Sequence, residues 1–286
     1  MHKLSLSTNQ LISKSALVTL IIILSGVLWF VFQPSTTADA PSPANEMELV
    51  FSDEFEQTEL DSDKWVDCYW WDIEGCTNAG NSELEWYLPE NVSVHRGSLI
   101  LEARKEVITN HNRELFPYSS GMVTTGRDIS DIDEPPKFSF QYGYVEVKAN
   151  FPAGTGLWPA IWLLPITHES RPEIDIFELL GDDVQLARLH IHYVDDEKER
   201  QSVGHKQFVP DLTDGWQTIG LNWQEDKVTW YLNGSKIWEV TEPEAIPHEP
   251  LYLILNLAVG GDYPGPPDSS TQFPAQVEID YVRIWQ

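Results

Sequence analysis

Polar and apolar residues alternate along much of the chain, in short runs that are rich in Val, Ile, Trp and Tyr. Turn residues separate these runs, and Asn233-Gly234 between two of them indicates a tight hairpin. No segment after the N-terminal region sustains the periodicity of a helix. The pattern predicts an all-β sandwich of two antiparallel sheets, with no internal repeat and no second domain. The predicted strands cover residues 140–151, 173–180, 187–193, 216–223, 227–232, 236–240, 251–259 and 277–285.

Three acidic residues interleave with bulky β-formers in the run 171–178, Arg-Pro-Glu-Ile-Asp-Ile-Phe-Glu. In an extended strand Glu173 and Asp175 share one face, but strict alternation would turn Glu178 to the other face. A one-residue bulge at Ile176-Phe177 returns Glu178 to the acidic face, and bulges are common beside active sites. The run therefore predicts three carboxyl groups in one cleft. The alternative is the solvated face of an amphipathic strand.

Composition limits the class of protein and the class of partner. With 286 residues, 42% of them hydrophobic, the chain can bury one sizeable core and is not a disordered protein. Its 45 acidic and 18 basic residues give a formal net charge of -27, which repels nucleic acid, acidic membrane surfaces and polyanionic polysaccharides. A neutral partner is favoured. The charge is explained equally well as a solubility or salt adaptation of the surface.

The N-terminus has the layout of an export signal. Lys3 and Lys14 precede the apolar run 16–32, and the next basic residue is Lys64, so the positive-inside rule directs the following domain out of the cytoplasm. Ala38-Asp39-Ala40 resembles a signal-peptidase site, whereas the apolar run nearly reaches the length that spans a membrane. Secretion after cleavage and attachment to the membrane through residues 16–32 are both open.

These features divide the chain into three parts. Residues 1–33 form the predicted signal peptide or membrane anchor, and residues 34–46, rich in Pro, Ser, Thr and Ala, form a flexible linker. Residues 47–286 form the predicted functional domain. We expect it to be extracytoplasmic.

The chain has two cysteines, Cys68 and Cys76. In an exported protein their short spacing predicts a disulfide that closes a small loop rather than a metal site, which would need more ligands nearby. Free thiols remain the alternative if the loop keeps the two Cα atoms too far apart.

Several other side chains are of the kinds that line a solvent-filled binding groove on one face of a sheet. Trp158 and Trp162 lie four residues apart just before the acidic run, and an indole suits a pyranose ring because it offers a large apolar face with a polar N–H edge. Asn256 is the lone amide in an apolar strand, where it needs a partner or a substrate. His190 and His192 share one strand face, although such a pair is more often structural.

The ordered set of motifs resembles the laminarinase-type members of glycoside hydrolase family 16, from Val50 to Gln286. The acidic run and the Trp-Pro-Ala block before it carry most of this resemblance. The matching blocks are Phe51-Ser-Asp-Glu-Phe55, Leu60-Asp-Ser-Asp-Lys-Trp65, Gly80-Asn-Ser-Glu-Leu-Glu-Trp-Tyr87, Tyr142-Gly-Tyr-Val-Glu146, Gly156-Leu-Trp-Pro-Ala-Ile-Trp-Leu-Leu-Pro165, the acidic run, Asn256-Leu-Ala-Val-Gly-Gly261 and Asp280-Tyr-Val-Arg-Ile284.

This resemblance implies a β-jelly-roll sandwich with a concave substrate-binding cleft and a retaining glycosidase mechanism. Glu173 then corresponds to the nucleophile that forms the glycosyl-enzyme intermediate. Glu178 corresponds to the acid that protonates the leaving oxygen and later activates water, and Asp175 assists between them. Close negative neighbours raise a carboxyl pKa, so we expect Glu178 to hold the proton and Glu173 to be ionised.

The resemblance also assigns binding residues: Trp158, Trp162, Asn81, His192 and Asn256 match positions that line the family's cleft. Catalysis of this type needs no cofactor.

Family members often carry a structural calcium ion on the convex side. Glu54, the Gly97 carbonyl and Asp280 correspond to that site here, and oxygen ligands suit this hard cation.

The acidic run carries one residue more than in the lichenase and xyloglucan-transferase branches, which favours β-1,3-glucan as the substrate of an endo-β-1,3-glucanase. Mixed-linkage β-glucan, a β-1,3-galactan and transglycosylation remain alternatives, as does a non-catalytic β-glucan-recognition module of similar fold. Two segments, 68–76 and 127–136, depart from the common family pattern. If they block one end of the cleft, the enzyme cuts at chain ends, and if they leave it open, it cuts internally. The sequence does not decide between these two modes. We expect a monomer.

Overall fold

The computed structural model describes residues 42–70, 76–131, 133–167 and 169–286. The predicted signal peptide or anchor, residues 1–33, and most of the predicted linker lie outside the described residues. The described residues belong to one compact unit, Pro41–Gln286. Within them, no helix combines the length and the apolar character needed to cross a membrane.

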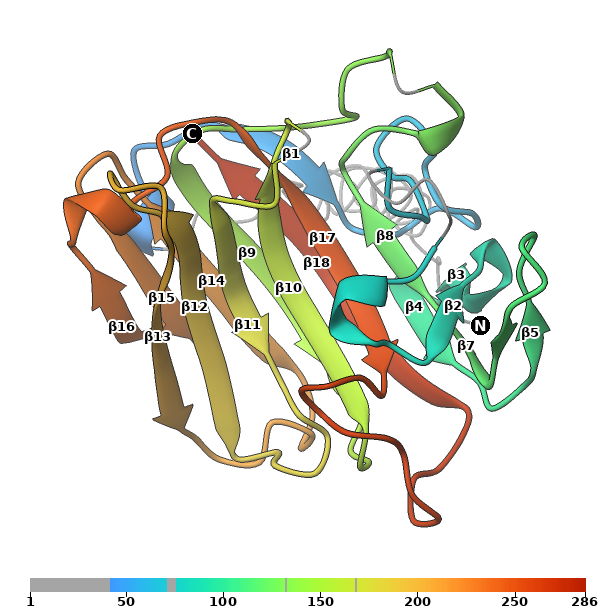
Figure 1. Ribbon diagram of the computed structural model, residues 1–286. Helices are drawn as coiled ribbons and strands as arrows, with labels where there is room; N and C mark the ends of the chain where they lie inside the picture. The colour runs from blue at the N-terminus through green and yellow to red at the C-terminus, as the bar shows by residue number, and fades with distance from the viewer. Residues whose placement is uncertain (1–41, 71–75, 132, 168) are drawn as a thin grey trace, which may run out of the picture. The chain divides into compact units, whose positions relative to one another are not determined.

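Two antiparallel sheets form the domain, as the alternation predicts (Figure 1). Among the described residues, the first sheet has eight strands in the order β16-β15-β14-β9-β18-β4-β3, with β1 also paired to β18. Its strands are β1 (Leu49–Asp53), β3 (Val92–His95), β4 (Ser98–Ala103), β9 (Gly143–Asn150), β14 (Gln217–Trp223), β15 (Val228–Leu232), β16 (Ser235–Val240) and β18 (Ala275–Trp285).

The second sheet carries the site described below. Among the described residues it has six strands in the order β13-β12-β11-β10-β17-β8, and β12, β11, β10 and β17 run side by side in Figure 1. Its strands are β8 (Met122–Thr124), β10 (Leu157–Pro165), β11 (Glu173–Glu178), β12 (Leu186–Val194), β13 (Arg200–Phe208) and β17 (Leu251–Val259).

Smaller elements complete the domain. Two short pairs lie outside the main sheets, namely β2 (Glu85–Tyr87) with β7 (Tyr118–Ser120) and β5 (Ile108–Thr109) with β6 (Leu115–Phe116). The described helical turns are all 3-10 turns: η1 (Ser42–Ala44), η2 (Ala79–Asn81), η3 (Pro89–Asn91), η4 (Ile129–Asp131) and η5 (Pro243–Ala245). The all-β prediction is therefore confirmed.

The core lies between the two sheets, because each sheet turns one set of alternating side chains inward. Val145 and Val147 of β9 and Leu253 and Leu255 of β17 belong to one buried cluster that draws on both sheets. The outward side chains of the six-stranded sheet are therefore not part of this core. The predicted hairpin is also present, since Asn233 and Gly234 have φ of 50° and 75° between β15 and β16.

The end of the predicted linker is packed rather than free. Ser42–Ala44 forms the turn η1, the Ala44 side chain is fully buried, and Glu48 N donates to the Gln286 carbonyl. Residues 42–46 of the predicted linker thus lie among the described residues, and η1 packs against β9.

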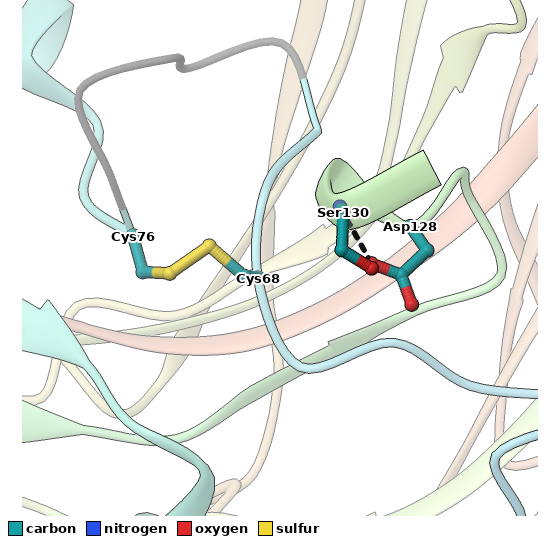
Figure 2. Close-up of a disulfide and its surroundings, with 4 residues drawn as sticks. All are labelled: Cys68, Cys76, Asp128 and Ser130. Carbon is teal, nitrogen blue, oxygen red and sulfur yellow. Dashed lines mark hydrogen bonds between the residues drawn. A yellow bond between two sulfur atoms is a disulfide. The ribbon is translucent and has the colours of Figure 1, made fainter. Parts of the chain in front are cut away.

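Cys68 and Cys76 form the predicted disulfide (Figure 2). Tyr69, inside the closed loop, packs edge-on against Tyr87 and Trp162, with ring centroids 5.6 and 6.2 Å away. The turn η4 is drawn in the same close-up in Figure 2, where the Ser130 backbone N–H donates to Asp128 Oδ1, as the Ser130 hydroxyl does too. The Arg127 guanidinium just before it lies 5.5 Å from the Trp70 ring centroid, so these two side chains of the segments 127–136 and 68–76 contact each other.

Candidate active site

A cleft of about 700 Å³ opens on the outer face of the six-stranded sheet. Its floor comes from outward residues of β10, β11, β12 and β17, and its rim comes from loops. All eight residues predicted for catalysis and substrate binding line it: Glu173, Asp175, Glu178, Trp158, Trp162, His192, Asn256 and Asn81.

The predicted bulge in β11 brings the three acids to one face. Trp162 pairs with Asp175 and Ile161 pairs with Phe177, so Ile176 is the extra residue that has no partner on β10. Ile176 and Phe177 are both in the core, whereas Asp175 and Glu178 face the cleft. Strict alternation would have buried Glu178 on the core side.

Glu178 is held on both carboxylate oxygens by neighbouring strands. Trp158 Nε1 on β10 donates to Oε1 at 3.1 Å, and His190 Nδ1 on β12 lies 2.9 Å from Oε2. The His190 ring lies against Gly204 of β13, where a Cβ atom would come within 2.2 Å of its Cδ2. The glycine therefore makes the space that this imidazole occupies.

Asp175 lies between the two other acids and is buried. His192 Nε2 is 3.3 Å from its Oδ2, and Trp230 from the opposite sheet donates to its backbone carbonyl at 3.1 Å. Burial and the charge of Glu178 raise the pKa of Asp175 well above its usual range. Burial lowers the pKa of His192, so that imidazole favours its neutral form.

Glu173 has a cationic partner. Arg171 NH1 donates to its Oε2 at 2.6 Å. Burial and the charge of Asp175 raise the pKa of Glu173 to about 8, against the opposing effects of Arg171 and His192. A raised carboxyl pKa in this cluster was expected from the sequence, and burial raises the pKa values of Glu173 and Asp175.

The predicted binding residues form a connected floor. Trp162 Nε1 donates to Asn256 Oδ1 at 2.9 Å, and Asn256 Nδ2 donates to the Tyr87 hydroxyl at 3.0 Å. The lone amide of β17 is thus satisfied by neighbours while it lines the cleft. Trp162 is only 8% exposed and Trp158 is more open, so Trp158 offers the larger face to a ligand.

Sequence reasoning did not assign several residues that line the cleft. His190 shares the strand face of His192, so alternation placed it correctly even though its contact with Glu178 was not foreseen. Arg171 stands two residues before Glu173 in the acidic run. Tyr69, Glu83 and Tyr263 come from loops and from the segment before β2, and only the tertiary fold brings them here.

Two of the three residues predicted to hold calcium, Glu54 and Asp280, have cationic partners in the structure. Both oxygens of Glu54 accept hydrogen bonds from Arg283, at 2.7 Å each, and Lys148 Nζ lies 2.8 Å from Asp280 Oδ2. Cationic side chains thus already neutralise both carboxylates. Among the described side chains, Asp175, His190 and His192 also bring possible metal-ligand atoms within 4.8 Å of one another. Their contacts with the neighbouring carboxyl groups assign them to the acid cluster.

The chain matches a family model. The model described as Glycosyl hydrolases family 16 covers residues 82–283. Among relatives, endo-1,3-1,4-beta-glycanase EglC of Rhizobium meliloti (strain 1021) is 32% identical over 82% of this chain and 51% of its own length. The chain therefore spans about half the length of that relative.

Solved structures resemble the whole domain. The endo-beta-1,3-glucanase from Pyrococcus furiosus is 34% identical, with a TM-score of 0.70 over 84% of this chain and 94% of that chain. The laminarinase catalytic domain from Thermotoga maritima is 33% identical, with a TM-score of 0.73 over 84% of this chain and 98% of that chain.

Proposed function

The chain belongs to glycosyl hydrolase family 16, and on that premise we propose that it is a retaining endo-β-1,3-glucanase that hydrolyses β-glucans such as laminarin. The observation that carries the proposal is the bulged strand β11, which directs Glu173, Asp175 and Glu178 into one cleft. The names of the two similar solved structures support the linkage. A neutral glucan also suits a chain with a formal charge of -27.

In the proposed reaction Glu173 attacks the anomeric carbon while Glu178 protonates the departing glycosidic oxygen. Water, deprotonated by Glu178, then releases the sugar from Glu173 with retention of configuration. Arg171 favours the ionised form of Glu173 that attacks, and Trp158 and His190 orient the Glu178 carboxyl. Asp175 assists between the two glutamates. No cofactor takes part in these steps.

Reducing-sugar release from laminarin tests this proposal directly. We expect the purified protein to release sugar as a series of short oligosaccharides, and the first product to keep the β configuration by NMR. Glu173→Gln should abolish release, whereas Glu197→Gln, an exposed control, should not. Release from mixed-linkage β-glucan or β-1,3-galactan but not from laminarin would move the specificity to one of those polymers. No release from any of them by folded protein would favour recognition without catalysis.

We also propose that the domain works outside the cytoplasm, as a monomer. The Lys-flanked apolar run 16–32 supports export, and a Cys68–Cys76 disulfide suits an oxidising compartment. Cell fractionation with N-terminal sequencing of the mature protein distinguishes cleaved secretion from attachment through residues 16–32. Light scattering of the purified protein tests the monomer.

A further inference from the structure

Two buried acids lie beside the cleft and take no part in the proposed reaction. Glu83, just before β2, is 7% exposed and lines the cleft, and Glu85, the first residue of β2, is fully buried. No Lys, Arg or His of the described chain forms an ion pair with either of them. A buried carboxylate without a cation is strongly disfavoured, so the pair needs another source of stabilisation.

The hydrogen bonds indicate what that source is. Val259 N donates to Glu85 Oε2 at 2.7 Å, whereas the other oxygen, Oε1, is buried and has no donor among the described residues. The Glu83 and Glu85 carboxyl groups contact each other at hydrogen-bonding range. Two carboxylates have no proton to donate, so this contact requires one of the two to be protonated.

The surroundings favour the protonated pair. Burial raises the pKa of Glu83, and burial together with the charge of Glu83 raises the pKa of Glu85 well above its usual range. Among the described residues, the titratable side chains that interact with the pair are those of Tyr69 and Tyr87, whose pKa values burial also raises. The neighbouring loop between β17 and β18 contributes no cation: it contains Asp262, whose Oδ2 lies 3.3 Å from the Ser82 hydroxyl, and Asp268.

The pair is connected to the residues that line the cleft. Asn81 Nδ2 donates to Glu83 Oε1 at 2.9 Å, and the Tyr87 hydroxyl lies 3.5 Å from Glu83 Oε2. Tyr87 in turn accepts the hydrogen bond from Asn256. A second negative charge at Glu85 would therefore repel the Glu83 carboxylate and, through Glu83, shift the amide side chains of Asn81 and Asn256.

We propose that Glu83 and Glu85 share one proton and that this acid pair positions Asn81, Tyr87 and Asn256 for glucan binding. The inference rests on the proposed function for its substrate. Glu83 presents its carboxyl edge to the cleft as an acceptor for a sugar hydroxyl, and Glu85 acts on binding through Glu83. The pair sets KM rather than the chemical step, because it is separate from the Glu173 cluster.

Steady-state kinetics on laminarin test the pair, with KM and kcat measured separately from about pH 6 to about pH 9. For the native protein we expect KM to rise about tenfold at the alkaline end, where loss of the shared proton leaves an unsatisfied buried charge. Glu85→Gln should keep KM nearly constant over that range, because its amide donates permanently to Glu83. Glu85→Leu should raise KM at every pH, with kcat changed much less.

The control is Glu90→Gln, which alters an exposed glutamate five residues away and should reproduce the native KM profile. Thermal unfolding provides a readout that does not depend on activity. An acid pair whose pKa is raised by folding stabilises the protein at low pH and loses that effect as pH rises, so native Tm should fall at alkaline pH more than Tm of Glu85→Gln.

The outcomes separate the two proposals. If the folded native protein does not cut laminarin, the proposed function fails and the Tm profiles still test the shared proton. If Glu85→Gln and the native protein show the same dependence of both KM and Tm on pH, the acid pair is overturned. Should Glu85→Leu fail to fold, the comparison with Glu85→Gln decides alone.

Discussion

Glu178 depends on a neighbouring strand for its orientation, since Trp158 Nε1 donates to Oε1 at 3.1 Å. Trp158→Phe keeps an aromatic ring beside the cleft but removes this donor. We predict a fall in kcat of up to about tenfold, because a hydrogen bond to an uncharged carboxyl group contributes about 0.5–1.5 kcal/mol. Stopped assays on laminarin measure the change, and circular dichroism checks the fold.

The matched control is Trp216→Phe. Trp216 has an exposed indole just before β14 of the eight-stranded sheet, and the Lys148 ammonium lies over its ring. The variant should leave kcat within experimental error of the native value. An increase in KM alone for Trp158→Phe would show that the indole serves only as a stacking face for the sugar.

Arg171 favours the ionised form of Glu173. Burial and Asp175 raise the pKa of Glu173 to about 8, and Arg171 opposes this rise by favouring the ionised carboxylate. In Arg171→Gln the pKa of Glu173 rises further. Because the proposed mechanism requires Glu173 to be ionised when it attacks, we predict that the acid limb of kcat/KM moves to higher pH by about one unit.

A pH–rate profile of the native protein and Arg171→Gln gives this shift. Arg200→Gln is the control, since this arginine also lines the cleft but forms no ion pair in the described structure. Equal acid limbs for the native protein and Arg171→Gln would mean that Arg171 contributes only to substrate contact.

The identities of the three acids and of the two tryptophans could be read from the sequence because each motif is local. The residues that contact them in the cleft could not be read from the sequence. His190 reaches Glu178 across a strand pair, and Glu83 enters the cleft from a segment far from β11 in the sequence. Such contacts depend on which strands become neighbours, which a pattern of residues along one strand does not encode.

Among the elements, β11 was the most predictable. The bulge at Ile176-Phe177 follows from the conflict between an acidic face and strict alternation, and the register confirms it. β13, in contrast, was missed. Its sequence from Arg200 to Phe208 is polar and largely exposed because it is an edge strand, so it lacks the apolar alternation that marks a half-buried strand.

That edge strand nevertheless supports the acid cluster. Gly204 pairs with His190, and an added Cβ atom would meet His190 Cδ2 at 2.2 Å and Nε2 at 2.7 Å. Gly204→Ala should therefore displace the imidazole from Glu178 and lower kcat by about tenfold, although residue 204 does not touch the acids. The measurement is kcat on laminarin, together with Tm.

Ser202→Ala is the control. Ser202 lies on the same strand as Gly204 and pairs with His192 of β12, and the variant loses only a hydroxyl. It should leave kcat close to the native value. If Gly204→Ala keeps native kcat and Tm, the imidazole has room to move without consequence, and its contact with Glu178 is not required.

At the scale of the whole molecule, the sheets place several carboxyl groups where water is excluded. Burial raises the pKa values of Glu173, Asp175, Glu83 and Glu85. An acid whose pKa is higher in the folded than in the unfolded protein binds more protons when folded. Its stabilising effect is complete below the unfolded pKa and is lost as pH rises through the folded pKa.

We therefore predict that the free energy of unfolding falls between about pH 5 and about pH 8, by about 1.4 kcal/mol per pH unit for each extra proton that the folded state holds. Urea unfolding at several pH values measures it, and high ionic strength screens the repulsion among the exposed charges that make up the net charge of -27. Glu173→Gln should make the fall shallower, because it removes an acid whose pKa is raised to about 8. Glu197→Gln, at an exposed position, should leave it unchanged. A free energy of unfolding that rises with pH over this range would mean that the buried acids are ionised in the folded protein and are stabilised by groups other than their protons.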